Sequence, residues 1–171
     1  MNYIVMDLEW NQASDEKTKL ANELLFEIIE IGAVRVSENR EILDSYQQVI
    51  HPRVYKKLHY KIQEITHFTN EELSHGKDFK RAIVEFLDWC GDDYMFCTWG
   101  SMDLTELQKN MRHYKLERIL DFPLFYVDLQ KMFSLRYDDG HMKRTLTSAV
   151  EFLNIEEDKG FHRALSDAYY T

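Results

Sequence analysis

The sequence contains little cysteine, proline or glycine and no long hydrophobic run. Its 171 residues include 2 cysteines, 2 prolines and 6 glycines. Cys90 and Cys97 stand in apolar segments without C-x-x-C spacing, so we expect buried reduced thiols and neither a disulfide nor a zinc site. No apolar run approaches the roughly 18 residues of a membrane-spanning helix, and the N-terminus has no basic leader. These absences predict a soluble, cytoplasmic protein with no membrane partner.

Positive charge is also in short supply. The chain has 21 lysines and arginines against 30 aspartates and glutamates, which gives a formal net charge of −9. This balance argues against nonspecific coating of long nucleic acid. Nucleic acid stays open as a substrate, because carboxylates that hold divalent cations present a positive centre to phosphate. Two basic runs, RVYKKLHYK at 53–61 and HMKR at 141–144, are each either backbone contacts or solvated surface charge.

The remaining composition is that of one ordinary domain over residues 1–171. With 44% hydrophobic and 13% aromatic residues, the chain can bury a substantial core. Hydrophobic periodicity predicts strands at 3–6, 26–36, 41–50 and 94–99, a last strand in FPLFYV before Asp128, and helices at 79–90, about 102–114, 128–135 and 145–153. This order predicts an α/β fold whose mixed sheet has three antiparallel strands, then parallel strands, with helices on both faces.

Acidic residues follow the ends of predicted strands. Asp7 and Glu9 are two residues apart, so the period of two places both carboxylates on one face. Asp103 follows the strand YMFCTW and opens the next helix. Taken alone, the pair is weak evidence and also suits a polar loop start, and Asp103 alone is more often a helix-start aspartate favoured by the dipole. Together with Asp167, these hard oxygen donors suit Mg²⁺ or Mn²⁺ and not Zn²⁺.

The last segment, FHRALSDAYYT, adds a histidine. If the whole segment were helical, the five residues from His162 to Asp167 would turn the two side chains by roughly 140° and aim them apart. A joint site therefore requires His162 in a loop and Asp167 in the first turns of a terminal helix. Without further evidence, a single histidine in such a loop is more often structural.

Four segments together resemble the motifs of one enzyme family. YIVMDLEWN, FEIIEIGAV, FCTWGSMDLTEL and GFHRALSDA are similar, in order and over nearly the whole chain, to the DEDDh 3′-to-5′ exonucleases of the ribonuclease H-like superfamily. The five catalytic positions of that family fall on Asp7, Glu9, Asp103, His162 and Asp167. The segment TWGSMDL is most similar to the corresponding segment of the exonucleases that trim short RNA and histone messenger RNA, and of their bacterial relatives. This similarity favours RNA over DNA.

The resemblance implies a two-metal phosphodiesterase that releases nucleoside 5′-monophosphates from the 3′ ends of single-stranded RNA or DNA. Asp7 would bridge two Mg²⁺ or Mn²⁺ ions, with Glu9 and Asp167 on the nucleophile side and Asp103 on the other ion, partly through water. His162 would take the proton from the attacking water. The alternatives are a catalytically silent nucleic-acid-binding module, a DNA exonuclease of proofreading type, and a structural metal-binding protein.

Three further expectations concern neighbouring residues. Leu8 and Trp10, beside the carboxylates, are candidates for contact with the terminal nucleotide, although Trp10 is equally a core or rim aromatic. Trp99 is expected in the core beneath Asp103. The segment IQEITHFTNEEL is similar to the family's leucine-threonine-glycine-isoleucine-threonine segment, but His67 stands where glycine is usual and leaves the loop conformation open.

Only four residues follow Asp167, so the chain is either naturally short or truncated within its terminal helix. We expect Asp167 to be less firmly held than Asp7 or Glu9, because helix ends fray. Tyr169 or Tyr170 should pack inward, and metal binding should help to order the segment. The sequence does not identify protein partners.

Overall fold

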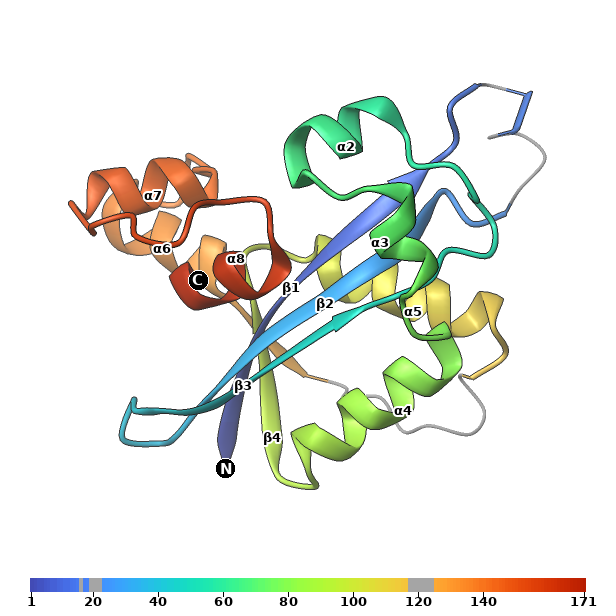
Figure 1. The fold of residues 1–171 in the computed structure, drawn as a ribbon. Helices are drawn as coiled ribbons and strands as arrows, with labels where there is room; N and C mark the ends of the chain where they lie inside the picture. The colour runs from blue at the N-terminus through green and yellow to red at the C-terminus, as the bar shows by residue number, and fades with distance from the viewer. Residues whose placement is uncertain (16, 19–22, 117–124) are drawn as a thin grey trace.

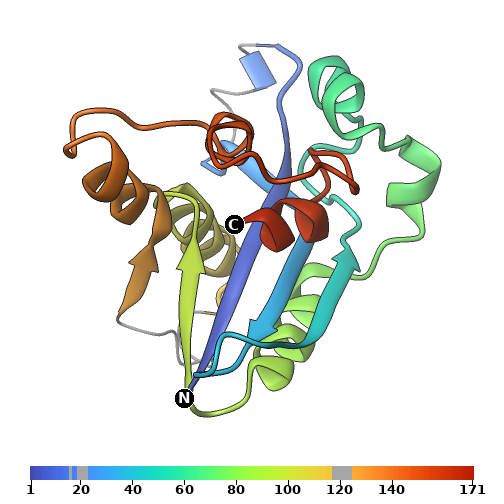
Figure 2. The same cartoon turned by 90° about the vertical axis from the view of Figure 1, so that its left-hand side faces the viewer.

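A mixed β-sheet forms the centre of the molecule (Figure 1, Figure 2). The computed structural model describes residues 1–15, 17–18, 23–116 and 125–171, and within them the sheet has five strands in the order β3-β2-β1-β4-β5. The strands are β1 (Asn2–Gln12), β2 (Phe26–Val36), β3 (Ile42–Val49), β4 (Tyr94–Thr98) and β5 (Tyr126–Asp128). β1, β2 and β3 pair antiparallel, whereas β1, β4 and β5 pair parallel. The predicted α/β mixed sheet is confirmed.

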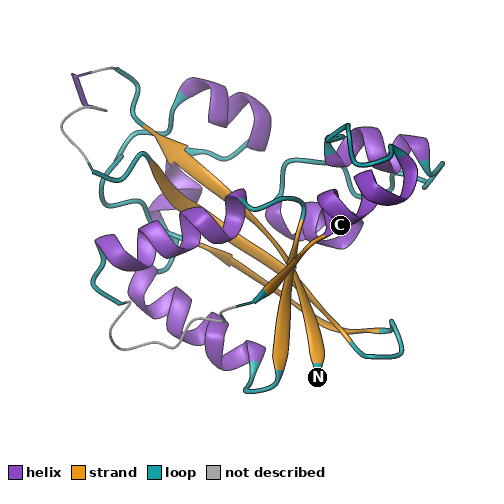
Figure 3. Cartoon of the chain, turned by 180° about the vertical axis from the view of Figure 1, so that it is seen from behind, coloured by secondary structure: helices purple, strands orange, loops and turns teal. Residues whose placement is uncertain are grey.

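Helices cover both faces of this sheet, as predicted. The described helices are α2 (Tyr60–Thr66), α3 (Asn70–Ser74), α4 (Phe79–Cys90), α5 (Met102–His113), α6 (Leu129–Tyr137), α7 (Leu146–Phe152) and α8 (Ala164–Tyr170). α4 and α5 pack on one face, and α8 lies on the other (Figure 1, Figure 3). α8 is thus the helix that covers the middle of the sheet opposite the main core.

Alternation along β1 assigns its side chains to these two faces. Leu8 belongs to the main core beneath α4 and α5. Val5 belongs to a smaller cluster against which Leu165 of α8 packs. Because successive side chains of a strand point to opposite faces, Asp7 and Glu9 share the face of Val5. The sheet therefore directs both carboxylates toward α8.

β1 is longer than the predicted strand, which ended where the acidic residues begin. Its pairing with β2 continues from Tyr3 opposite Val36 to Gln12 opposite Phe26, with a register shift just after Glu9. Acidic side chains on one face do not interrupt the backbone ladder, which lies in the plane of the sheet. The strand therefore runs through the acidic motif and past it.

The helices α2 and α3 were not predicted. α3 opens with a capping box, in which Thr69 and Glu72 each accept from the other's backbone N–H. α2 ends at His67, which adopts the left-handed conformation with φ 59°. The histidine thus takes the backbone conformation that glycine adopts most readily, which answers the question that the sequence left open.

The remaining predictions concern the two cysteines, the last strand and membrane-spanning helices. Cys90 and Cys97 are buried free thiols, as predicted. Of the predicted FPLFYV strand, residues 122–124 lie outside the described part of the chain, and β5 begins at Tyr126. No helix among the described residues is both long enough and apolar enough to cross a membrane.

Candidate active site

β1 presents two carboxylates side by side on the face that α8 covers. Asp7 stands opposite Gly32 of β2, and Glu9 stands opposite Glu30. Asp7 and Glu9 are half-buried. Because both lie within the strand, the pleat of β1 fixes their common orientation.

Asp103 approaches the same strand from the start of α5. β4 ends at Thr98, and the chain turns through Gly100 at φ 92° into the helix. Asp103 is 5% exposed, and its Oδ1 accepts a hydrogen bond from the backbone N–H of Leu8 at 3.1 Å. Leu8 separates the two carboxylates of β1 in the sequence, so this bond fixes the start of α5 beside both.

The fourth carboxylate comes from α8, whose first turn lies directly on the sheet. A Cβ atom at Gly32 would come within 2.1 Å of the backbone of Ala164 and Leu165, so only glycine permits this approach. Ala164 and Ala168 are buried at 0% and 1% exposure, which shows that small side chains face the strands. This close packing carries Asp167 toward β1.

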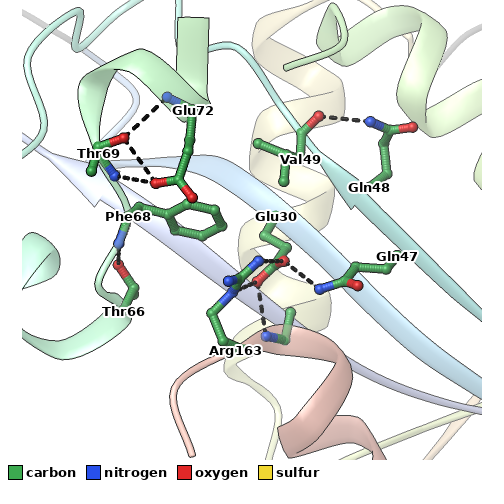
Figure 4. A network of polar contacts seen from close by, with 10 residues as sticks. Glu30, Gln47, Gln48, Val49, Thr66, Phe68, Thr69, Glu72 and Arg163 are labelled. Carbon is green, nitrogen blue, oxygen red and sulfur yellow. Dashed lines mark hydrogen bonds and ion pairs between the residues drawn. The ribbon is translucent and has the colours of Figure 1, made fainter. Parts of the chain in front are cut away.

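An ion pair between a buried carboxylate and a partly exposed guanidinium fixes the start of α8 (Figure 4). Glu30 is fully buried, and its carboxylate accepts from Nε2 of Gln47 at 2.8 Å and from the backbone N–H of Ala164 at 3.0 Å. Arg163 donates two more hydrogen bonds to this carboxylate, at 2.8 and 3.2 Å. The guanidinium also lies over the ring of Phe68, 4.3 Å from its centroid. One residue thus joins α8 to β2 and to the loop before α3.

His162 lies in the loop before α8, as the sequence predicts for a joint site with Asp167. The backbone of His162 is left-handed, with φ 68°, and the residue is exposed. Its N–H donates to both carboxylate oxygens of Asp167, each at 3.2 Å. The loop and the carboxylate therefore position each other, and the imidazole is accessible from solvent.

Three of the four predicted carboxylates meet in one group. One oxygen from each of Asp7, Glu9 and Asp167 lies within 4.8 Å of the others. Burial and then the charge of Asp103 raise the pKa of Asp7 well above its usual range. Burial, followed by the charges of Asp167 and Glu30, raises the pKa of Glu9 to about 8. Burial is also the main cause that raises the pKa of Asp103 to about 7 and the pKa of Asp167 to about 6.

This arrangement fits a divalent cation. Ionising all of these neighbouring carboxyl groups is unfavourable because their negative charges repel one another. A cation bound among them would make the ionised forms favourable. The group offers hard carboxylate oxygens, which Mg²⁺ and Mn²⁺ prefer. The thiols of the described residues, Cys90 and Cys97, are buried in other clusters. The donor chemistry therefore suits a hard divalent cation.

The neighbours of the carboxylates differ from expectation. Leu8 is 3% exposed and belongs to the main core, so its side chain points away from the carboxylates and the expected nucleotide contact finds no support. Trp10 packs against the same core and lies 5.8 Å from the ring of Phe26, which favours the rim-aromatic alternative. Trp99 is not beneath Asp103: its ring packs edge-on against α6 and its Nε1 donates to a backbone carbonyl. Alternation along β1 places the side chains of Leu8 and Trp10 on the core side.

Tyr170 anchors the end of α8, and Tyr169, the other candidate, is 45% exposed. The hydroxyl of Tyr170 accepts from the N–H groups of Asp158 and Lys159, at 2.8 and 2.9 Å, and donates to Oδ1 of Asp158 at 2.9 Å. Its ring also packs on Phe161, with centroids 5.2 Å apart. The predicted inward packing is confirmed for Tyr170.

The sequence reasoning missed Glu30, Arg163 and Gly32. A glutamate inside the apolar run FEIIEIGAV signals a buried charge that needs a partner. Nothing in the sequence says that the partner is Arg163, because it lies 133 residues away. Gly32 gave a signal too, since a glycine inside a strand often marks a close backbone approach.

Comparison with known proteins places this geometry in a family. The model of the exonuclease family RNase_T matches residues 4–171. DNA polymerase III subunit epsilon of Aquifex aeolicus is 26% identical over 170 residues, which cover 99% of this chain and 76% of that protein. DNA polymerase III PolC-type of Staphylococcus epidermidis is 29% identical over 102 residues, or 60% of this chain. The match spans only 6% of that polymerase.

Solved structures agree on the fold. The nuclease domain of 3′hExo, a DEDDh family member bound to rAMP, has a TM-score of 0.81 at 22% identity, with 99% of this chain and 86% of that chain covered. Exonuclease I of E. coli in complex with a dT13 oligonucleotide has a TM-score of 0.72 at 15% identity, with 99% and 39% covered. The chain therefore belongs to the RNase_T exonuclease family, with the ribonuclease H-like fold of the DEDDh exonucleases.

Proposed function

We propose that this chain is a divalent-metal-dependent 3′-to-5′ exonuclease that hydrolyses single-stranded nucleic acid, preferably RNA, and releases nucleoside 5′-monophosphates. The observation that carries the proposal is the meeting of Asp7, Glu9 and Asp167 within 4.8 Å, with Asp103 hydrogen-bonded to the same strand. Residues 1–171 would act as one exonuclease domain. The presence of all five catalytic positions argues against a silent binding module.

Asp7, Glu9, Asp103 and Asp167 would hold Mg²⁺ or Mn²⁺. Two such ions, when bound, supply an activated water and stabilise the charge that develops at phosphorus and on the leaving 3′ oxygen. Asp7 suits the shared position, because the charges of the other three carboxylates all act on it. Its place in the middle of β1 keeps it fixed while α5 and α8 contribute from either side.

His162 would accept the proton of the attacking water. General bases in hydrolytic sites must reach the water and hold a free lone pair near neutral pH, and an imidazole meets both conditions. The N–H of His162 donates to both oxygens of Asp167, so the proposed base is tied through its backbone to one metal-binding carboxylate. Its exposure leaves room for a phosphodiester to approach.

The RNA preference rests on the TWGSMDL segment and on the structural similarity to a nuclease domain bound to rAMP. A second candidate, a DNA exonuclease of proofreading type, is favoured by the sequence relatives, which are DNA polymerase III proteins. Both candidates use the same carboxylates and differ only in the sugar that the site accepts.

One experiment tests the proposal and separates the candidates. RNA and DNA strands of the same sequence, labelled at the 5′ end, are incubated with Mn²⁺ or Mg²⁺, and products are resolved by length. We expect a ladder that shortens from the 3′ end, faster for RNA, and no ladder for strands with a blocked 3′ terminus. Asp7→Asn serves as the inactive control. Wild-type protein that leaves both strands intact with either metal would overturn the proposal.

A further inference from the structure

A basic surface lies beside the C-terminal end of β1, past the carboxylates of Asp7 and Glu9. Lys56 and Lys57 precede α2, and Tyr60 and Lys61 begin it; all four residues are exposed, and we call them the α2 basic edge. Within the described part of the chain, none of the three lysines forms an ion pair. Tyr60 is 66% exposed, and its ring stacks on His59 with centroids 4.7 Å apart.

Buried polar groups hold the backbone that leads to this edge. Glu27 is 1% exposed, and its carboxylate accepts hydrogen bonds from the N–H groups of Arg53, Val54 and Tyr55 at 2.6, 2.9 and 2.8 Å. The hydroxyl of Tyr114 donates to the same carboxylate at 2.9 Å. A buried carboxylate is costly unless satisfied, so its donors fix the entrance to the loop.

Asn11 fixes the rest of the loop to the catalytic strand. Its side chain is fully buried, donates to the carbonyl oxygens of Tyr55 and Lys57 at 2.9 and 3.0 Å, and accepts from the N–H of His59 at 2.9 Å. Asn11 follows Glu9 by two residues on β1, a distance of about 7 Å along a strand. The loop that carries Lys56 and Lys57 is therefore held against β1 two residues past Glu9.

Within the second basic run of the sequence, Arg144 makes internal contacts. Arg144, in the segment 141–144, pairs with Asp138 at 2.7 Å, and its guanidinium lies over the ring of Phe152 at 4.5 Å. Its backbone carbonyl accepts from Nε1 of Trp99 at 2.9 Å. Arg144 is thus committed to internal contacts, and Lys143 is the exposed lysine of this run.

We propose that the α2 basic edge binds single-stranded nucleic acid upstream of the 3′ end, with Lys56, Lys57 and Lys61 on backbone phosphates and Tyr60 stacked on a base. The inference rests on the proposed function, because it assigns a path to the same substrate. On a chain with a net charge of −9, unpaired cations on a fixed loop complement a polyanion. An exposed aromatic ring beside such cations is the usual platform for a base, tolerant of sequence.

The test compares substrates of two lengths. The double variant Lys56→Gln/Lys57→Gln and the variant Tyr60→Ala are assayed on a 12-nucleotide strand and on a dinucleotide. We expect KM for the 12-nucleotide strand to rise about tenfold in Tyr60→Ala, the size typical of one lost base stack, and to rise in the double lysine variant because two phosphate contacts are lost. kcat, and KM for the dinucleotide, should stay within twofold of wild type. Tyr60→Phe keeps the ring and should restore the wild-type KM.

Salt dependence supplies a second readout that does not need catalysis. Affinity for the 12-nucleotide strand is measured by fluorescence anisotropy, in the Asp7→Asn background, between 50 and 300 mM salt. Each phosphate contact removed should make the negative slope of log K against log salt shallower by about 0.7. The double lysine variant should therefore lose about 1.4 units of slope. Lys80→Gln, an exposed lysine of α4, is the matched control and should change neither slope nor KM.

The outcomes are distinct. A wild-type protein that degrades the 12-nucleotide strand, with variants whose KM and salt slope are unchanged, would overturn the α2 basic edge and leave the proposed function intact. A wild type that degrades nothing contradicts the proposed function, and the anisotropy slopes then decide the surface by themselves. An equal loss in Lys80→Gln would also refute the surface, because the effect would then follow from net charge alone.

Discussion

The ion pair between Arg163 and Glu30 should decide how firmly α8, and with it His162 and Asp167, is held. Arg163→Met removes the cation and keeps an unbranched side chain of similar reach. The carboxylate of Glu30 would then retain its bonds from Gln47 and from the backbone of Ala164, and lose two from the guanidinium. A fully buried negative charge would be left without a counter-charge.

The magnitude follows from the burial of the two partners. Removing one partner of a fully buried pair costs about 3–5 kcal/mol. The Arg163 side chain is 40% exposed and that of Glu30 is 0% exposed, so water screens one side of the interaction. We therefore expect a loss of about 2–3 kcal/mol in the free energy of unfolding. For a chain of this size, that loss corresponds to a melting temperature roughly 4–12 °C lower.

The assay combines thermal unfolding with hydrogen exchange, both in excess chelator so that bound metal does not mask the effect. Arg163→Met should have a lower melting temperature than wild type. The variant should also speed the exchange of the amides of residues 161–171, relative to wild type, more than that of the amides of β1 and β2. Adding Glu30→Gln to the variant should recover part of the loss, because the uncompensated charge disappears. Arg81→Met, which breaks an exposed pair with Glu85 on α4, is the matched control and should change stability little.

The reasoning would be refuted by an Arg163→Met protein whose stability and exchange match those of wild type. It would also be refuted if the double variant with Glu30→Gln were less stable than Arg163→Met alone. Either result would mean that α8 is held by its apolar contacts and by Gly32, without a contribution from the charge of Arg163.

Four further predictions follow from the site. Asp7→Asn should lower the hydrolysis rate by several orders of magnitude with the fold retained, and excess chelator should do the same reversibly; full activity in chelator contradicts a metal site. His162→Ala should bind Mn²⁺ as wild type does in calorimetry yet lose most turnover, and an unchanged rate would assign the proton transfer elsewhere. The pKa of Glu9 is raised to about 8 and that of Asp167 to about 6. Above about pH 4.5 the folded metal-free protein therefore keeps protons that the unfolded chain has released. The stability of the metal-free protein should fall as the pH rises from about 4.5 to 8. Thermal shift should therefore show a larger stabilisation by Mn²⁺ at pH 8 than at pH 5.5, and an equal shift at both would contradict the carboxylate site. Gly32→Ala should displace α8, because its Cβ would meet backbone atoms at 2.1 Å, and a variant with normal activity and melting temperature would show that the helix can shift at no cost.

The sequence predicted the fold class, and periodicity, which reports local geometry, placed two of the catalytic candidates on one face of a strand; Asp103, His162 and Asp167 joined them through the family resemblance. A period of two placed Asp7 and Glu9 together. A continuous helix would aim the side chains of His162 and Asp167 apart, so a joint site required His162 in a loop. The same alternation, applied to Leu8, predicts that its side chain points to the face opposite the carboxylates. These inferences needed only neighbours in the sequence.

The rest depends on contacts between distant residues. Glu30 and Arg163 are 133 positions apart in the sequence. The hydrogen bonds of Asn11 to the loop before α2 join residues 44 to 48 positions apart. Short helices such as α2 and α3 are set by tertiary packing more than by propensity, so their apolar pattern is too brief to read. Only the capping signal at Thr69 was available in advance.

The central claim is that carboxylates from β1, α5 and α8 form a divalent-metal site for phosphodiester hydrolysis. Its most direct test is anomalous diffraction from crystals of the protein soaked in Mn²⁺. The account predicts manganese density in contact with the carboxylates of Asp7, Glu9 and Asp167, with a second ion toward Asp103, and none in crystals of Asp7→Asn. Ordered Mn²⁺ elsewhere on the surface, with none among these carboxylates, would contradict it.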